Sequence, residues 1–173
     1  ASNAFEQLTH DVYDDINPRF INHSTRIVFS SDRPDDTLRT GGDFHKMQNH
    51  YDIFEYNYAS HSNVLRRITN TPDVDETSPM GFGGQYISYL SDASGVVNRY
   101  IAHVDSTISF VDTAAHYRYI VHSYPVTDYG RNIVEQDVTN TLKNYTQIVF
   151  YKGRYWMYQD TLASSVSSYT PVL

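Results

Sequence analysis

The chain has 173 residues, with 13 Lys and Arg against 20 Asp and Glu, so its formal net charge is −7. It contains no cysteine, which excludes disulfides, thiolate zinc sites and a thiol nucleophile. The acidic balance argues against nucleic acid as a partner, and no run approaches the roughly 18 apolar residues of a membrane-inserted helix. The 16 tyrosines favour strands and binding surfaces over an aliphatic helical core.

The first five residues, ASNAF, contain neither a basic stretch nor an apolar stretch of the kind found in a secretory signal. The tripeptide Ser2-Asn3-Ala4 is typical of what tag removal leaves, so we interpret residues 1–5 as a tag remnant or linker. Residues 6–173 are predicted to form the folded part. Residues 161–173 are rich in Ser and Thr and are interpreted as a strand cut short or a tail.

An internal repeat of about 60 residues organises the chain. Ser31-Asp32 recurs as Ser91-Asp92, and Asn17-Pro18 recurs as Ser78-Pro79. A strand-like run is found three times in aligned positions, at 27–29, 87–89 and 148–150. A second such run also has three copies, at 51–56, 99–105 and 154–160. These registers predict units of about 16–76, 77–138 and 139–173.

The repeated units are predicted to consist of strands. Their runs are short, β-branched or aromatic, and bounded by Ser, Asp, Asn and Gly, while the only helical candidates are 43–49 and 161–168. Three or four strands at a fixed spacing are typical of a β-propeller blade. We therefore predict an all-β chain of about two and a half four-stranded antiparallel blades, with long loop insertions at 34–50 and 105–132.

The order of motifs in these units is specific enough to suggest a family. The strings NPRF at 17–20, RIVFSSDR at 26–33, YDIF at 51–54 and LRRITN at 65–70 together resemble the TolB-like, WD40-like (PD40) β-propeller repeat. The chain departs from that repeat at 22–25 and 82–84, where the tight Pro-Asp-Gly turn is replaced. The resemblance implies a fragment of a larger propeller from a bacterial envelope protein, in the periplasm or associated with the cell envelope.

Titratable side chains do not form a recognisable catalytic set. The histidines lack the His-Glu-x-x-His spacing of a zinc hydrolase, and no Gly-x-Ser-x-Gly elbow is present. Acidic clusters at 11–15, 32–36 and 73–76 supply oxygens that Ca²⁺ would accept, but the same residues serve as turn and strand caps. We expect no enzyme activity and no cofactor, leave a metal open, and expect Ser31-Asp32 and Ser91-Asp92 to hold turns through backbone amides.

Aromatic side chains in the insertions are the best binding candidates, because rigid amphipathic rings anchor protein partners. The alternative is that one alternating set of rings packs between blades while the other is ordinary strand decoration. The candidate partner-binding residues are Phe44, His50, Tyr51, Tyr117, Tyr119, Tyr124 and Tyr129. We therefore predict a non-catalytic module for protein–protein interaction. The alternative is an accessory or gating propeller of a peptidase or glycan-active hydrolase. Open blade edges could also allow self-association.

Overall fold

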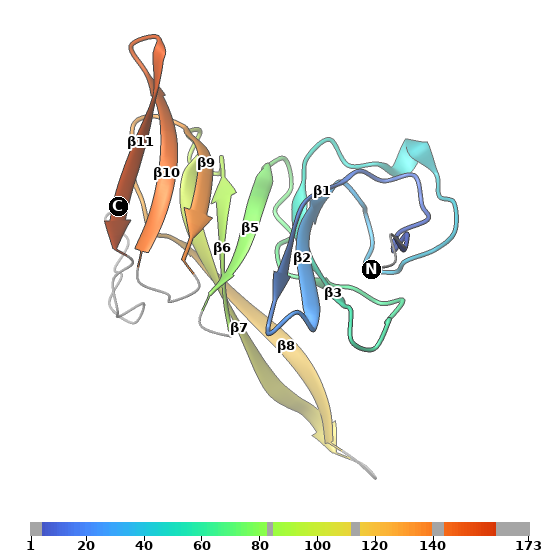
Figure 1. The fold of residues 1–173 in the computed structure, drawn as a ribbon. Helices are drawn as coiled ribbons and strands as arrows, with labels where there is room; N and C mark the ends of the chain where they lie inside the picture. The colour runs from blue at the N-terminus through green and yellow to red at the C-terminus, as the bar shows by residue number, and fades with distance from the viewer. Residues whose placement is uncertain (1–4, 83–84, 112–114, 140–143, 162–173) are drawn as a thin grey trace.

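Three antiparallel β-sheets stand side by side in the chain (Figure 1). The computed structural model describes residues 5–82, 85–111, 115–139 and 144–161, without the side chains of 82 and 106–118. In these segments the helical structure is one 3-10 turn, Phe44–Lys46, and no helix is long and apolar enough to cross a membrane. The predicted all-β, propeller-type architecture is confirmed.

The sheets are meanders, in which each strand pairs with the next along the chain. The first sheet contains β1 (Asp15–Ile21), β2 (Arg26–Ser31), β3 (Asp52–Asn57) and β4 (Arg66–Arg67). The second sheet contains β5 (Glu76–Phe82), β6 (Tyr86–Ser91), β7 (Asn98–Val111) and β8 (Ala115–Pro125). The third sheet contains β9 (Ile133–Val138), β10 (Asn144–Tyr151) and β11 (Arg154–Thr161).

The first two sheets reproduce the predicted repeat in detail. Asn17 and Ser78, which precede the aligned prolines, both have a positive φ of 53°, and each lies in a bulge of the first strand of its sheet. The predicted insertions are also found. The β2–β3 connection carries the 3-10 turn, and β7 and β8 extend together into a long hairpin closed between Val111 and Ala115. The second helical candidate, 161–168, lies outside the described residues apart from Thr161, which ends β11.

The third unit differs from its predicted alignment. Its sheet begins at Ile133, so residues assigned to the end of unit two form its first strand. Ile148 was aligned with the buried Ile87, but in β10 the buried residues are Tyr145, Gln147 and Val149. A slip of one residue moves every side chain of a strand to the other face. The aligned Ile148 and Phe150 consequently point away from the second sheet.

Hydrophobic side chains fill the spaces between neighbouring sheets. Val28 and Ile53 of the first sheet pack in one cluster with Ile87, Tyr89 and Ala102 of the second. A separate cluster joins the second sheet to the third, with Ile101 and Tyr145 as its buried members. Because each cluster uses residues from two sheets, the sheets are held as successive layers.

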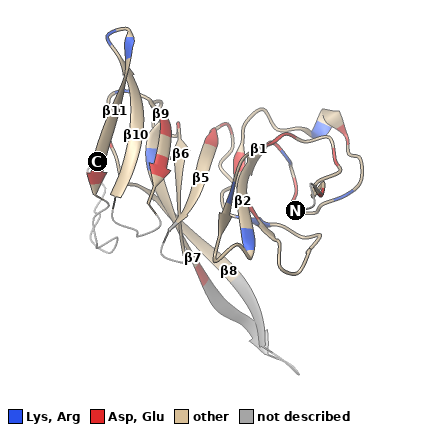
Figure 2. Cartoon of the chain, in the orientation of Figure 1, with Lys and Arg blue, Asp and Glu red and all other residues tan. Residues whose placement is uncertain are grey.

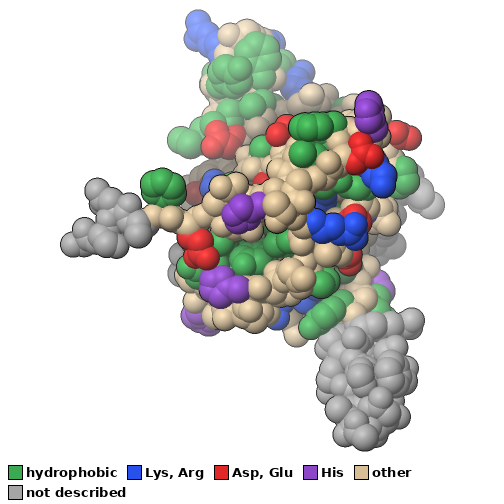
Figure 3. Space-filling view, turned by 90° about the vertical axis from the view of Figure 1, so that its right-hand side faces the viewer, with side chains coloured by type: hydrophobic (Ala, Val, Ile, Leu, Met, Phe, Trp, Pro, Cys, Tyr) green, Lys and Arg blue, Asp and Glu red, His purple; other side chains and the backbone are tan. Residues whose placement is uncertain are grey.

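The outer face of the first sheet, which has no neighbouring sheet among the described residues, is also covered. Its core residues Phe29 and Phe54 pack with Leu8 from the N-terminal segment and Leu38 from the β2–β3 connection. Backbone hydrogen bonds tie these covering segments together, such as Gly41 N to the carbonyl of His10 at 2.9 Å. Figure 3 looks onto this side, where backbone and polar side chains dominate and charged side chains are scattered.

Candidate binding surfaces

The repeated aspartates act as structural ties at the same place in two sheets. Asp32 accepts a hydrogen bond from the backbone N–H of Asp14 at 2.9 Å, and Asp92 accepts one from that of Asp75 at 2.9 Å. This confirms that the Ser-Asp pairs hold the entry to each first strand. In the described parts of the chain, no group of three or more acidic or histidine side chains is arranged to hold a metal ion.

A second polar motif is repeated at the start of each third strand. Asp52 in β3 accepts a hydrogen bond from the backbone N–H of Thr71, and Asn98 in β7 accepts one from that of Tyr129. The hydroxyl of Thr69 accepts from Ile53 N at 2.8 Å, as does that of Thr127 from Arg99 N. Thr69 and Thr71 lie 58 positions before Thr127 and Tyr129, whereas Asp52 lies 46 positions before Asn98. In both sheets these bonds tie the segment after the fourth strand to the third strand. The buried polar side chains at these positions are therefore explained by the hydrogen bonds that they form within each sheet.

Two carboxyl groups meet in the junction between the first and second sheets. Asp52 is fully buried and forms an ion pair with Arg67, while Glu76 accepts a hydrogen bond from the hydroxyl of Thr71 at 3.2 Å. Burial raises the pKa of Glu76 to about 7, and the nearby charge of Asp52 adds to that shift. Glu76 therefore holds a proton at mildly acidic pH and releases it near neutrality.

The junction between the second and third sheets is built differently. Arg99 is fully buried, and its Nε donates to Gln136 at 2.7 Å while its guanidinium lies 3.7 Å from the centre of the Tyr145 ring. Its two terminal nitrogens have no hydrogen-bond partner among the described residues. Burial lowers the pKa of Arg99 and raises that of Tyr145 to about 12. This junction uses a neutral amide where the other uses carboxylates.

A cavity opens where the first strands of all three sheets come together. It has a volume of about 260 Å³ and is lined by Asn17, Arg19, Ser78, Pro79, Met80, Val134, Glu135 and Gln136. Gln136 spans the wall by donating to the carbonyl of Ser78 at 2.9 Å. The close approach of β5 to β1 requires Gly81, because a Cβ there would lie 2.4 Å from Ile21. β1, β5 and β9 are each the edge of their sheet, so backbone groups face this region.

The predicted partner-binding residues are distributed over two ends of the sheets (Figure 1). Phe44, His50 and Tyr51 lie in the β2–β3 connection, where Phe44 is 68% exposed. His50 is half-buried, with its Nδ1 3.1 Å from Asn49 Oδ1, and the N–H of Tyr51 donates to Asp75. Of these three candidates, Phe44 is the one whose ring is exposed enough to contact a partner.

The other four candidates belong to β8 and the segment after it. Tyr117 lies in the distal part of the β7–β8 hairpin, in the stretch whose side chains are outside the description. Tyr119 is exposed, and Arg66 of the first sheet lies 4.5 Å from the centre of its ring. Tyr124 packs against the cluster between the second and third sheets, and Tyr129 is exposed. The seven residues therefore do not form one surface.

Among the described residues, the largest group of exposed large hydrophobic side chains lies elsewhere, on the β10–β11 hairpin. Its members are four aromatic residues and one methionine: Phe150, Tyr155, Trp156, Met157 and Tyr158. The sequence alignment counted these residues as further copies of the blade strands at 27–29 and 51–56. Repeat position alone does not show whether a strand is covered, so the alignment gave no signal that this hairpin is exposed.

A scan against protein-family models finds no match for the chain, and no curated protein sequence matches it.

Proposed function

We propose that the chain is a non-catalytic β-propeller-type module that binds an extended segment of another protein in the cavity along β1, β5 and β9. One observation carries this proposal. Three sheet edges and a polar cavity occur together, lined by residues from three separate sheets. Extended peptides can bind at a sheet edge through main-chain hydrogen bonds. The bulges at Asn17 and Ser78 limit such pairing on β1 and β5 to short stretches, so contacts with side chains that line the cavity supply the rest of the affinity.

The cavity lining suggests what kind of segment would fit. Arg19 from β1 and Glu135 from β9 offer one charge of each sign, while Met80 and Val134 add apolar contacts. An extended segment carrying an acidic and a basic side chain around a small apolar residue matches this arrangement. The aromatic rings of Phe44 and Tyr119 stay candidates for secondary contacts.

A binding role is favoured over catalysis by the state of the acidic groups. The paired carboxyls, Asp52 and Glu76, are at most 3% exposed, and Asp52 is engaged by Arg67. A glycoside-cleaving pair must flank a substrate in an open cleft. The TolB-like resemblance, and with it a bacterial cell-envelope location, is part of the proposal and rests on the sequence motifs alone.

Peptide selection tests the proposal directly. Peptides are selected from a displayed random library on the intact chain, and their affinities are measured by fluorescence anisotropy. Arg19→Glu and Glu135→Lys are each expected to weaken binding by about tenfold or more, because a charged contact is reversed. Thr25→Glu, which adds one negative charge in the exposed β1–β2 turn, is expected to leave affinity unchanged.

Two results would overturn the proposal. One is that no peptide is enriched over an unrelated protein. The other is that enriched peptides bind all three variants as well as the parent chain. Turnover of peptide or glycan substrates by the purified chain, lost on Asp52→Asn, would instead favour a hydrolase function.

A further inference from the structure

β11 is an open sheet edge with few of the features that normally prevent strands from pairing. All eight of its residues are exposed, with Tyr155 at 70% and Met157 at 77%. In the described part of the chain its one neighbouring strand is β10, whereas β3 and β7 are each covered by a fourth strand. Long apolar edges of this kind pair with other strands.

Three other sheet edges, β1, β4 and β5, carry protection that β11 lacks. β1 and β5 are interrupted by bulges, at Asn17 and Ser78, and β4 is only two residues long. β11 pairs with β10 in one unbroken register from Arg154 to Thr161, and it contains neither proline nor lysine. Bulges, prolines, charges and short length are the usual guards of an edge. The charged residues of β11, Arg154 and Asp160, lie towards its two ends, so its central residues are suited to receive a strand.

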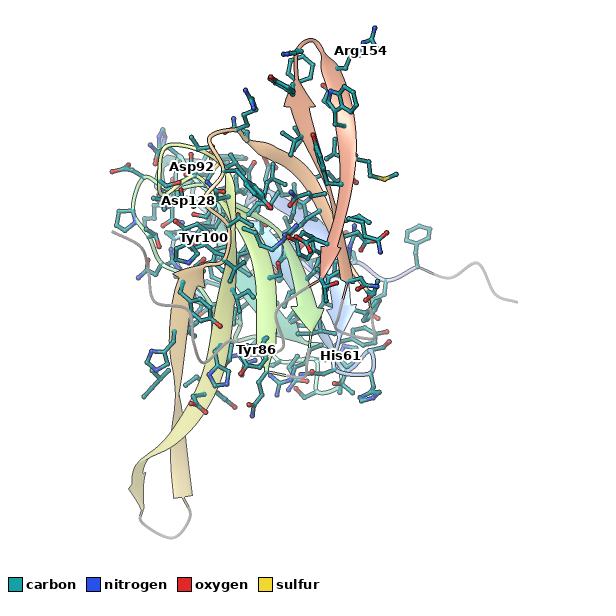
Figure 4. The ribbon with its side chains drawn as sticks, turned by 90° about the vertical axis from the view of Figure 1, so that its left-hand side faces the viewer. His61, Tyr86, Asp92, Tyr100, Asp128 and Arg154 are labelled. Atoms are coloured by element: carbon teal, nitrogen blue, oxygen red, sulfur yellow. The ribbon has the colours of Figure 1, made fainter. Side chains whose placement is uncertain are left out.

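The sequence of β11 is complementary to itself when reversed. Arg154 lies three residues before Met157 and Asp160 lies three residues after it, with Trp156 and Tyr158 on either side. In an antiparallel pair centred on Met157, Arg154 of each copy faces Asp160 of the other and Trp156 faces Tyr158. Figure 2 shows the basic tip and the acidic far end of β11, and Figure 4 shows Arg154 at the hairpin tip, pointing away from the sheets.

We propose that β11 binds β11 of a second copy of this chain, in an antiparallel register centred on Met157, joining two three-stranded sheets across a twofold axis. Opposite charges and aromatic pairs at facing positions stabilise antiparallel strands, and twofold symmetry uses each such pair twice. A shift of one residue would place Arg154 opposite Gln159 or Thr161 and remove both ion pairs. Charge complementarity therefore selects a second copy as the occupant.

Oligomeric state as a function of concentration is the first test. The full chain is expected to give the mass of a dimer in sedimentation velocity. Met157→Lys places two like charges opposite each other on the axis and is expected to weaken dimerisation about 100-fold or more. Val64→Lys, at another exposed apolar position, is the matched control and should leave the dimer intact. Circular dichroism of each variant confirms that it is folded.

Charge reversal tests the register. Arg154→Asp and Asp160→Arg each create like-charged pairs and should give monomers, while the double variant restores opposite charges and should restore the dimer. Because the chain has no natural cysteine, Met157→Cys supplies a single thiol. Opposed residues lie within disulfide distance in antiparallel sheets, so this variant should cross-link on oxidation and Gln159→Cys should not.

Three results would overturn the proposal. The first is a monomeric mass at every concentration tested. The second is a dimer that Met157→Lys and the single charge reversals leave unchanged. The third is a dimer that appears only when residues 162–173 are deleted, which would show that the chain's own C-terminal segment takes the edge. None of these readouts depends on peptide binding in the cavity, so the two proposals stand or fall separately.

Discussion

The first and third sheets each pack against the second sheet with one face, but their opposite, outer faces differ. On the first sheet, Phe29 is 5% exposed beneath the N-terminal segment and the β2–β3 connection. On the third sheet, Phe150 is 50% exposed, and β11 beside it is exposed throughout. The outer face of the first sheet is therefore covered by other segments of the chain, whereas the outer face of the third sheet is exposed.

The contrast shows where the chain places its insertions. The β2–β3 connection is long and carries Leu38 onto the first face, whereas β10 and β11 are joined by the tight turn Lys152-Gly153. A long surface loop costs little extra entropy per added residue, so covering a face with loops is feasible. A two-residue turn covers nothing. The first face is covered partly because its connection is long, and the third face stays exposed because its connection is too short to reach across it.

The largest expected effect comes from removing the ion cluster that holds the cover of the first face. Arg33 is fully buried, donates to Asp11 and Asp15, and lies close to the rings of Tyr13 and Phe29. Arg33→Met leaves two carboxylates without their cation and should lower the free energy of unfolding by about 3–5 kcal/mol. Urea denaturation followed by circular dichroism measures the loss.

Arg99→Met is the matched control for that change. Arg99 is equally buried, but its described partners are the neutral Gln136 and the ring of Tyr145. Arg99 forms no direct ion pair with a described carboxylate, so replacing this buried cation should leave stability nearly unchanged or raise it. If both variants lost the same free energy, burial alone would explain the effect, and the ion cluster would not be what fastens the cover.

A pair of aligned phenylalanines compares the two faces directly. Phe29→Ala removes a buried ring stacked on Phe54 and should cost about 3–4 kcal/mol, because it leaves a cavity. Phe150→Ala removes a half-exposed ring and should cost less than about 1 kcal/mol, since little apolar surface returns to water. Thermal and urea unfolding measure both changes. Equal losses would mean that the third face is covered in solution.

The repeat could be predicted because its signals are local and recur. Ser31-Asp32 and Ser91-Asp92 keep the same hydrogen bond in both sheets, and the bulges at Asn17 and Ser78 sit at aligned positions. The predicted alignment of the third copy is shifted by one residue, because Ile148 and Val149 are both apolar and β-branched and the sequence does not distinguish them. Only packing against the second sheet decides which of them is buried.

The candidate sites were harder to predict because they depend on residues far apart in the sequence. The cavity brings together Arg19, Met80 and Glu135, which come from three separate sheets, and no short motif marks their proximity. Similarly, loop aromatics such as Phe44 and Tyr119 were grouped by residue type, yet they lie at opposite ends of the sheets. Residue type indicates what a side chain can bind, but the sheet positions decide which side chains act together.

A pH-dependent effect distinguishes the two inter-sheet junctions. The pKa of Glu76 is raised to about 7 by burial and by Asp52, above the ordinary value of 4.5. The folded chain therefore binds a proton that the unfolded chain has released between pH 4.5 and 7, and folding stability falls as pH rises through that window. The loss should be at most roughly 3 kcal/mol and complete slightly above pH 7.

Glu76→Gln should remove this contribution, since the amide cannot ionise, and the difference from the parent chain should shrink as the pH is lowered to 4.5. Unfolding midpoints in urea at a series of pH values measure the difference. Gln136→Ala at the other junction should give a free-energy change that is constant across this range, because Gln136 does not titrate. The contrary result is that the parent chain and Glu76→Gln show the same change in unfolding free energy between pH 5 and 7. That result would show that Glu76 is already ionised in the folded chain. The two junctions would then differ in residue type and not in their response to protons.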